Sequence, residues 1–230
     1  MTGEQLQKAR LRSNRTQVQA AGDLGVSQTY LSLLEKGQRP LTEKLKRKAV
    51  RSFHLQPTEV PVEKALAELR IATDDQLATD LATLGYKGFS YLKPARTKNP
   101  AEVLFSALKA NDRDARLVEA LPWVVLNYPE MDWDALVAAA KINDLQNRLG
   151  YVTHIARRVA EFRKDKKTAA LLKKREDALE NSRLIREDTL CNSSMTEAEK
   201  RWLEVQRPEA ARHWRLLTDL APKSVNNYGY

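Results

Sequence analysis

Residues 16–40, TQVQAAGDLGVSQTYLSLLEKGQRP, constrain the fold of this chain most strongly. Two short stretches with helical periodicity flank Gly25, and Thr16 and Ser27 stand where helix N-caps are expected. Two short helices that cross steeply need a small residue where their backbones approach, and Ala21 supplies it. Gly25 supplies the freedom to adopt positive φ in the turn. The segment therefore predicts two helices joined by a tight turn.

Apolar residues at helical spacing predict the core around this pair of helices. The expected core residues from the pair and its flanking helices are Leu6, Ala9, Leu24, Val26, Leu31, Leu34, Leu45, Ala49, Val50 and Phe53.

The helical period continues along the chain and strand-like alternation is almost absent, so we expect an all-α protein. A Gly- and Pro-containing segment without a helical period, residues 86–98, predicts a linker or hinge. We expect an N-terminal helical domain at residues 1–85, a larger helical domain at 99–222 that dimerises or binds a partner, and a tail at 223–230. The expected helices span residues 3–13, 16–24, 27–36, 42–53, 60–71, 75–84, 99–111, 113–127, 132–141, 143–163, 165–189 and 208–220. A capping box formed by Thr196 and Glu199 predicts the start of one more helix.

Positive charge is concentrated near the N-terminus. The chain has 39 Lys and Arg against 30 Asp and Glu, and residues 1–55 hold eleven basic residues against four acidic ones. A polyanionic partner is therefore expected at this end of the chain. Nucleic acid is the first candidate and an anionic membrane surface is the second.

Several classes of protein do not fit the sequence. The longest apolar run, Ala120–Leu126, is far shorter than the roughly 20 residues of a membrane span, and no secretory signal is visible. The single cysteine, Cys191, excludes an internal disulfide and a multi-cysteine metal site. We expect a cytoplasmic, nucleoid-associated protein without cofactor or metal. Motifs for nucleotide binding or hydrolysis are not found in the sequence, so an enzyme is not expected.

The second helix of the pair, residues 27–36, is expected to enter the DNA major groove with its N-terminal end. Its polar residues can pair with base edges, because Gln matches adenine and hydroxyl groups match several bases. The expected base contacts are Gln28, Thr29, Ser32 and Leu33. The expected phosphate contacts are Gln17, Ser27, Tyr30, Lys36, Gln38 and Arg39.

Residues 4–53 resemble the lambda/434 repressor-type (Cro/XRE) DNA-binding domain. The residues that carry the resemblance are Arg10, Thr16, Gln17, Ala21, Leu24, Gly25, Val26, Ser27, Gln28, Leu31, Ser32, Leu34, Glu35, Gly37, Arg39 and Pro40. The resemblance implies a five-helix fold, binding of a palindromic operator as a homodimer, transcriptional control, and an ion pair between Arg10 and Glu35. Ala20 and Gly22 depart from the family pattern, and Gly22 should weaken its helix by up to about 1 kcal/mol relative to Ala.

Residues 101–152 resemble regulators encoded beside toxin or phage-defence genes, some of whose toxins resemble nucleotidyltransferases. This implies an autoregulatory antitoxin with a cognate toxin as partner. The alternatives are a stand-alone or prophage repressor, an enzyme that modifies nucleic acid, and a scaffold that localises on DNA. The enzyme would draw on candidates such as Asp132, Asp134 and His154.

Two further basic segments have open interpretations. Lys87, Lys93 and Arg96 lie in the 86–98 segment, which is either an auxiliary DNA-contacting arm or a hinge whose aromatic residues pack on the following domain. The run Arg163–Arg175 is either a binding surface for nucleic acid or an acidic partner, or a solvated helix face.

Overall fold

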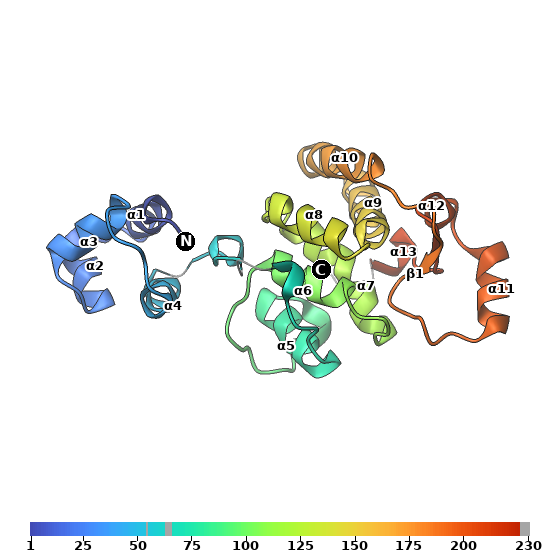
Figure 1. Ribbon diagram of the computed structural model, residues 1–230, viewed down its shortest axis with the longest axis horizontal. Helices are drawn as coiled ribbons and strands as arrows, with labels where there is room; N and C mark the ends of the chain where they lie inside the picture. The colour runs from blue at the N-terminus through green and yellow to red at the C-terminus, as the bar shows by residue number, and fades with distance from the viewer. Residues whose placement is uncertain (54, 63–65, 226–230) are drawn as a thin grey trace. The chain divides into compact units, whose positions relative to one another are not determined.

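The computed structural model describes residues 1–53, 55–62 and 66–225, and over these residues it is all-α apart from two strands of two residues each (Figure 1). It divides into two compact units, Met1–Pro61 and Val62–Tyr230. The all-α prediction is confirmed, whereas the units divide at residue 61 and not within residues 86–98.

The N-terminal unit contains helices α1 (Gly3–Arg12), α2 (Gln17–Leu24), α3 (Gln28–Glu35) and α4 (Glu43–Ser52), followed by the 3₁₀ turn η1 (Pro57–Glu59). Each α-helix has a threonine or serine N-cap whose hydroxyl accepts a backbone hydrogen bond. Leucines and alanines from all four helices meet in one core. The buried residues of this core are Leu6, Ala9, Ala20, Ala21, Leu24, Leu31, Leu34, Ala49 and Phe53.

The prediction of a helix over residues 60–71 is wrong for the described part of that range, which begins at the end of the N-terminal unit. Val60 is extended, with φ −61° and ψ 127°, because the ring of Pro61 disfavours the helical conformation in the residue before it. Only Leu66–Glu68 forms a 3₁₀ turn, η2, and residues 63–65 lie outside the described residues.

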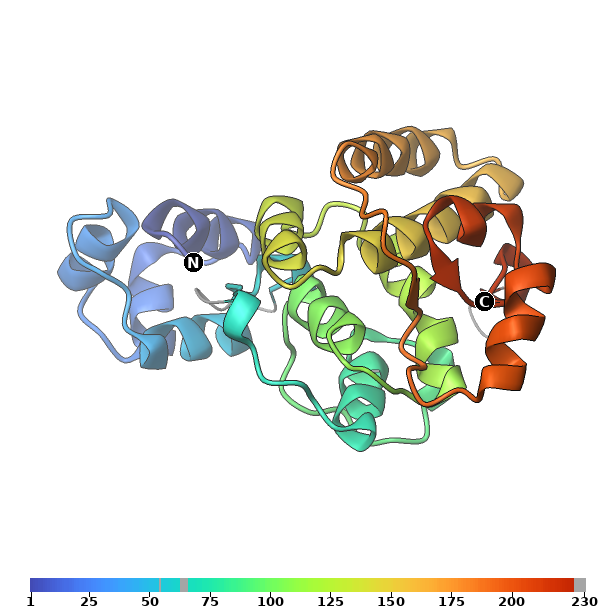
Figure 2. The ribbon, with the colours of Figure 1, turned by 45° about the vertical axis from the view of Figure 1, so that its right-hand side comes forward.

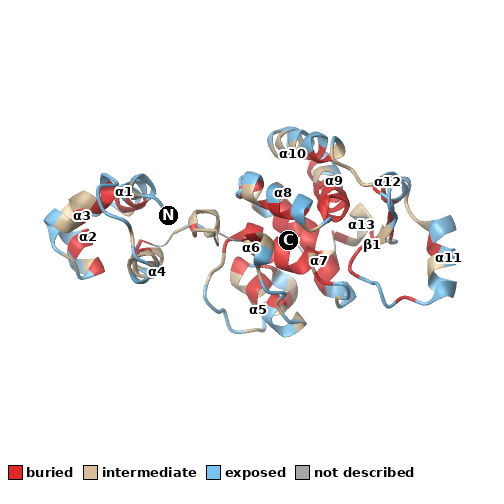
Figure 3. Cartoon of the chain, in the orientation of Figure 1, coloured by how far each residue is buried: buried red, intermediate tan, exposed pale blue. Residues whose placement is uncertain are grey.

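The C-terminal unit is a helical bundle. Its main elements are α5 (Asp74–Leu84), the 3₁₀ turn η3 (Lys87–Phe89), α6 (Pro100–Leu108), α7 (Ala115–Asn127), α8 (Trp133–Ile142), α9 (Gln146–Phe162) and α10 (Lys166–Glu180). Figure 3 shows its buried residues gathered in α6, α7 and α9. Helices α9 and α10 pack along each other (Figures 1 and 2).

Helix α5 and the segment after it belong to the core of this second unit. Leu77 and Leu81 are fully buried there, and the rings of Tyr86 and Trp123 pack edge to face with centroids 5.2 Å apart. Residues 86–98 are therefore not a hinge between two bodies, because Tyr86 and Phe89 of this segment are part of the core, although Tyr91 is exposed.

The last part of the chain is less helical than expected. It comprises β1 (Asp188–Thr189), α11 (Glu197–Gln206), α12 (Glu209–His213), β2 (Leu216–Leu217) and α13 (Pro222–Val225), with β1 and β2 paired in parallel. The expected helix over 208–220 breaks at Arg215, whose φ is +56°. Of the expected tail, residues 226–230 lie outside the described residues.

The helix expected over 165–189 ends at residue 180 because long-range contacts hold the following segment in an irregular, non-helical path. The buried side chain of Asn147 exchanges two hydrogen bonds with the backbone of Leu184, at 2.8 and 3.0 Å. The guanidinium of Arg148 makes two further bonds to the carboxylate of Asp188, at 2.7 and 2.9 Å. Both anchoring residues lie on α9, so α9 fixes the path from α10 to β1.

Candidate nucleic-acid interface

The α2–turn–α3 motif forms as its local sequence dictates. The Thr16 hydroxyl accepts from the backbone N–H of Gln19 at the start of α2, and Gly25 ends that helix in the left-handed conformation at φ +67°. The Val26 N–H then donates to the Ala21 carbonyl at 2.9 Å, which closes the turn. The Ser27 hydroxyl caps α3 by accepting from the N–H of Tyr30 at 3.2 Å.

The first turn of α3 presents polar side chains to solvent. Ser27, Gln28 and Thr29 are exposed, while Ser32 and Leu33 one turn later are half-buried. The opposite face of the helix is fully buried through Leu31 and Leu34. The four residues expected to contact bases thus lie outside the apolar face that attaches α3 to its unit.

An ion pair fixes the C-terminal end of α3 to α1. The Arg10 guanidinium donates to both carboxylate oxygens of Glu35, at 2.6 and 3.0 Å, and to the Arg15 carbonyl at 3.0 Å. Arg10 and Glu35 are each only 6% exposed. The pair expected from the resemblance is therefore present, and it links three segments of the unit.

Gln17, expected to contact phosphate, shares this network. Its side-chain amide donates to the Glu35 carboxylate at 2.9 Å. The bond holds the half-buried Gln17 side chain in place at the N-terminus of α2.

A close backbone contact also holds α1 to α3. A Cβ atom added at Gly3 would lie 2.1 Å from the Leu34 carbonyl oxygen and 2.7 Å from that of Glu35. Any side chain at Gly3 would push α1 away from the end of α3. Sequence reasoning did not identify this glycine, because its partner atoms are backbone atoms about thirty residues away.

The segment after α3 carries the remaining expected phosphate contacts. Lys36, Gln38 and Arg39 are exposed. The backbone N–H groups of Gln38 and Arg39 both donate to the Leu33 carbonyl, at 2.9 and 3.3 Å, and Gly37 has φ +71°. The turn is therefore fixed by its backbone, which leaves the three side chains available. Tyr30, the sixth expected contact, is half-buried and packs against the core of the unit.

Helix α4 adds basic residues that the sequence analysis counted only as charge. Lys44, Arg47 and Arg51 are exposed along it. The Lys48 ammonium lies over the turn, 2.8 Å from where a Cβ at Gly25 would stand. A search for exposed basic positions on the helix after the motif would have found these residues.

The three basic residues of the 86–98 segment that are expected as auxiliary DNA contacts belong to the C-terminal unit. Lys87, Lys93 and Arg96 are all exposed. The sequence left two interpretations of this segment, a DNA-contacting arm or a hinge whose aromatic residues pack on the following domain. Tyr86 and Phe89 are buried, as the second interpretation expects.

The residues considered for an enzyme have other roles in the structure. Asp132 caps α8 by accepting from the Ala135 N–H, and Asp134 is exposed in the first turn of α8. His154 bonds through Nδ1 to Glu176 at 2.8 Å. Within the described residues no group of three or more His, Cys, Asp or Glu side chains could hold a metal ion.

The pKa of the Glu176 carboxyl is well below its ordinary value. Burial opposes its ionisation, but hydrogen bonds from His154 and Arg157 outweigh burial and lower its pKa to about 2. The opposite holds for Cys191, where burial raises the pKa of the thiol to about 11.

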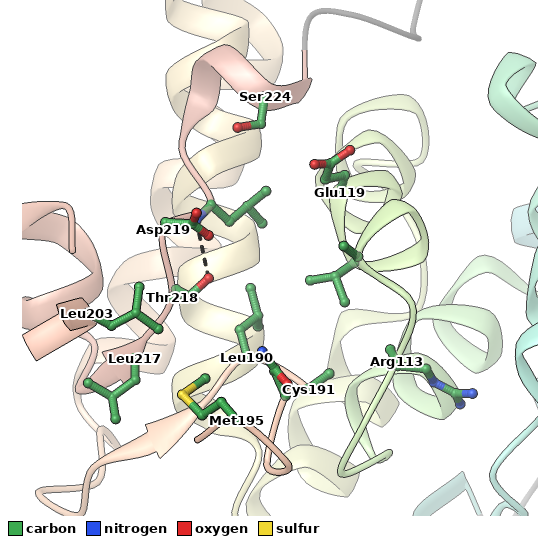
Figure 4. A pocket seen from close by; sticks show the side chains of 14 residues that line it. Arg113, Glu119, Leu190, Cys191, Met195, Leu203, Leu217, Thr218, Asp219 and Ser224 are labelled. Atoms are coloured by element: carbon green, nitrogen blue, oxygen red, sulfur yellow. Dashed lines mark hydrogen bonds between the residues drawn. The ribbon is translucent and has the colours of Figure 1, made fainter. Parts of the chain in front are cut away.

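The C-terminal unit also contains a cavity of about 230 Å³ between α7 and the segments around β1 and β2 (Figure 4). Leu190, Met195 and Leu217 form apolar walls, and Glu119 and Asp219 are acidic side chains of its lining. Arg113 also lines it, but its guanidinium donates to Asp74 and to the Ser106 carbonyl and points away from the other labelled side chains (Figure 4).

Comparison with known proteins identifies the N-terminal unit alone. A family model described as a helix-turn-helix domain matches residues 3–61, about a quarter of the chain. No curated protein and no solved structure matches the chain significantly. Across the described residues, no helix combines the length and the apolar character needed to span a bilayer. The matched range coincides with the compact unit Met1–Pro61, which is a helix-turn-helix domain.

Proposed function

We propose that this chain is a sequence-specific transcriptional regulator that binds double-stranded DNA with α3 in the major groove. One observation carries the proposal: the exposed first turn of α3 bears Gln28 and Thr29, while the buried Arg10–Glu35 pair fixes the other end of the same helix. A helix held at one end and polar at the other suits the reading of base edges.

The proposed contacts divide into two kinds. Gln28, Thr29, Ser32 and Leu33 read bases, Gln28 through its amide and Leu33 through a thymine methyl. The phosphate contacts come from residues at helix N-termini and from the turn after α3. This second group comprises Gln17, Ser27, Tyr30, Lys36, Gln38 and Arg39, with Lys87, Lys93 and Arg96 as auxiliary contacts.

We further propose that the regulator binds a palindromic operator as a homodimer. One domain of this size reads a half-site, and two copies about 34 Å apart along the duplex multiply the specificity. The C-terminal unit has a separate hydrophobic core, which supports an independent role for it in dimerisation or partner binding.

Within this class we favour an autoregulatory antitoxin-type repressor, on the resemblance of residues 101–152. A stand-alone or prophage repressor is the second candidate, and it shares the same proposed DNA contacts. The two differ in whether the C-terminal unit binds a toxin.

The test is binding of the purified full chain to duplex fragments that tile the DNA upstream of its own gene. We expect one fragment to bind with two chains per site and a palindromic footprint. Equal affinity for every fragment would contradict sequence-specific binding, and one chain per site would contradict the dimer. Co-purification with the product of the adjacent gene would support the antitoxin role, and its failure would leave the stand-alone repressor.

A further inference from the structure

Basic side chains gather where α9 ends and α10 begins. Residues 163–175 contain seven Lys and Arg against one acid, Asp165. Lys164, Lys166 and Lys174 are exposed, and none has a carboxylate within 4.0 Å among the described residues. Lys167 lies 4.0 Å from Glu130, and both side chains are largely exposed. We name Lys164, Lys166, Lys167 and Lys174 the α10 lysines.

Elsewhere in the same unit, three cations beside the core have close acidic partners. Arg113 pairs with Asp74 at 2.6 Å, and Arg148 pairs with Asp188 at 2.7 Å. Lys98 reaches the buried carboxylate of Asp80 at 2.6 Å. The α10 lysines therefore differ from these cations, because their charge has little compensation within the unit.

The stability of α10 does not explain these lysines. Lys166 and Lys167 occupy its first turn, where the helix dipole is positive and a cation is unfavourable by about 0.3–1 kcal/mol. Asp165, the N-cap, is the one acid there, and its carboxylate accepts from the Thr168 N–H. Lys173 forms an ion pair one turn along with Asp177, so only the N-terminal half of the exposed face is strongly basic.

The other face of α10 is firmly attached to the bundle. Leu172 and Leu179 are fully buried, and the Glu176 carboxylate bonds to His154 and Arg157 on α9. The α10 lysines therefore extend from a backbone that is held in place. A fixed group of cations, of which all but Lys167 have no close acidic partner among the described residues, is complementary to the phosphate backbone of a nucleic acid.

We propose that the α10 lysines bind the phosphate backbone of duplex DNA, independently of base sequence, and so give the C-terminal unit its own DNA contact. DNA is the chosen occupant because the same chain carries a helix-turn-helix domain. The inference rests on the proposed function only in that choice of polyanion.

The first test is site-directed crosslinking in the full chain. The chain has one native cysteine, Cys191, which does not compete for a thiol-directed label. Cys191 is fully buried, so a cysteine introduced at an exposed position takes up a thiol-directed photocrosslinker selectively. Ala170→Cys places the label among the α10 lysines, and Asn181→Cys places it at the exposed C-cap of the same helix, next to Glu180 and away from these lysines. We expect at least a fivefold greater yield with a random-sequence duplex from position 170. Equal yields, or none from position 170, would contradict the proposal.

The second test measures affinity as a function of salt on the same random-sequence duplex. Lys166→Gln with Lys174→Gln should lower the slope of log affinity against log salt by about 1.8, since each lost phosphate contact contributes about 0.9. Lys141→Gln with Lys223→Gln removes the same charge from two other exposed positions and should leave the slope unchanged. Equal slopes for the two double variants would overturn the proposal.

Both tests use random-sequence DNA, so their outcomes are separate from that of the proposed function. The salt slope can change even if the chain shows no sequence preference, and a specific operator can exist even if the slope is constant. Polyglutamate is the competing probe. If Lys166→Gln with Lys174→Gln weakens polyglutamate binding but leaves DNA binding intact, the surface fits an acidic protein and the DNA assignment is wrong.

Discussion

Arg10 on α1 and Glu35 at the end of α3 form a two-bond ion pair of 2.6 and 3.0 Å inside the N-terminal unit. The pair, together with the close approach of Gly3 to the carbonyls at the end of α3, sets the orientation of that helix. The residues that face solvent on α3 depend on this orientation.

Replacement of Arg10 by Met should destabilise the N-terminal unit by about 3–5 kcal/mol, because Glu35 is left as an uncompensated buried charge. All four tryptophans lie in the C-terminal unit, so far-ultraviolet circular dichroism should show the loss while tryptophan fluorescence does not. Arg10→Met with Glu35→Leu should recover much of the loss. The control Lys8→Met breaks only an exposed pair with Glu4 and should have little effect. An unchanged transition in Arg10→Met would contradict the assigned role.

Replacement of Gln28 by Ala should weaken binding to the cognate site by about 1–3 kcal/mol, because the paired hydrogen bonds to a base edge are lost. Affinity for random duplexes should hardly change. Gln7→Ala, at an exposed position on α1, is the control. Competition binding with both duplexes measures the difference, and equal losses on both would show that Gln28 does not read a base.

Replacement of Arg39 by Ala should weaken binding to every duplex and reduce the salt slope by about 0.9, as expected for one lost phosphate contact. Lys8→Ala, which removes one exposed charge from α1, should leave the slope nearly unchanged. Titrations at four or more salt concentrations give the slope. A slope equal to that of the parent chain would mean that Arg39 does not contact phosphate.

Replacement of Gly150 by Ala should destabilise the C-terminal unit by about 1–3 kcal/mol or more, as for other overpacked cores. A Cβ at Gly150 would lie 2.2 Å from the ring of Trp214, which is buried against α9. Gly22→Ala is the matched control: it adds a methyl group with no atom within 4 Å, so it should stabilise α2 by up to about 1 kcal/mol. Urea unfolding followed by tryptophan fluorescence measures the first effect, and a stable Gly150→Ala variant would refute the packing.

The free energy of unfolding of the C-terminal unit should decrease at low pH, because Glu176 becomes protonated and loses its interactions with His154 and Arg157. Its pKa is lowered from 4.5 to about 2 in the folded chain, so the stabilisation is complete above pH 4.5 and is lost as the pH falls toward 2. Glu176→Gln should be less stable than the parent chain at pH 6, and the difference should shrink between pH 4.5 and 3. Urea unfolding at several pH values measures it, and a constant difference would contradict the assignment.

The local structure of the N-terminal unit could be predicted because its signals are local. Thr16, Ser27 and Gly25 act on neighbouring backbone groups, so the bounds of α2 and α3 were predicted within a residue. The Arg10–Glu35 pair came from the resemblance, since nothing local connects two residues 25 positions apart.

The errors arise where distant contacts override local pattern. The end of α10 depends on Asn147 and Arg148, which bond to residues about forty positions away. The domain boundary was misplaced because Tyr86, in a segment rich in turn-forming residues, is in fact buried against Trp123. Val60 was assigned to a helix although Pro61 follows it, and that signal was available in the sequence.

The most direct test of the central claim is selection of bound sites from genomic fragments by the full chain and by Gln28→Ala in parallel. The account predicts that the parent chain enriches one palindromic sequence and that the variant loses its preference at symmetry-related positions of that palindrome. Enrichment of no sequence by the parent chain, or of the same sequence with the same preference by both proteins, would contradict base reading by α3.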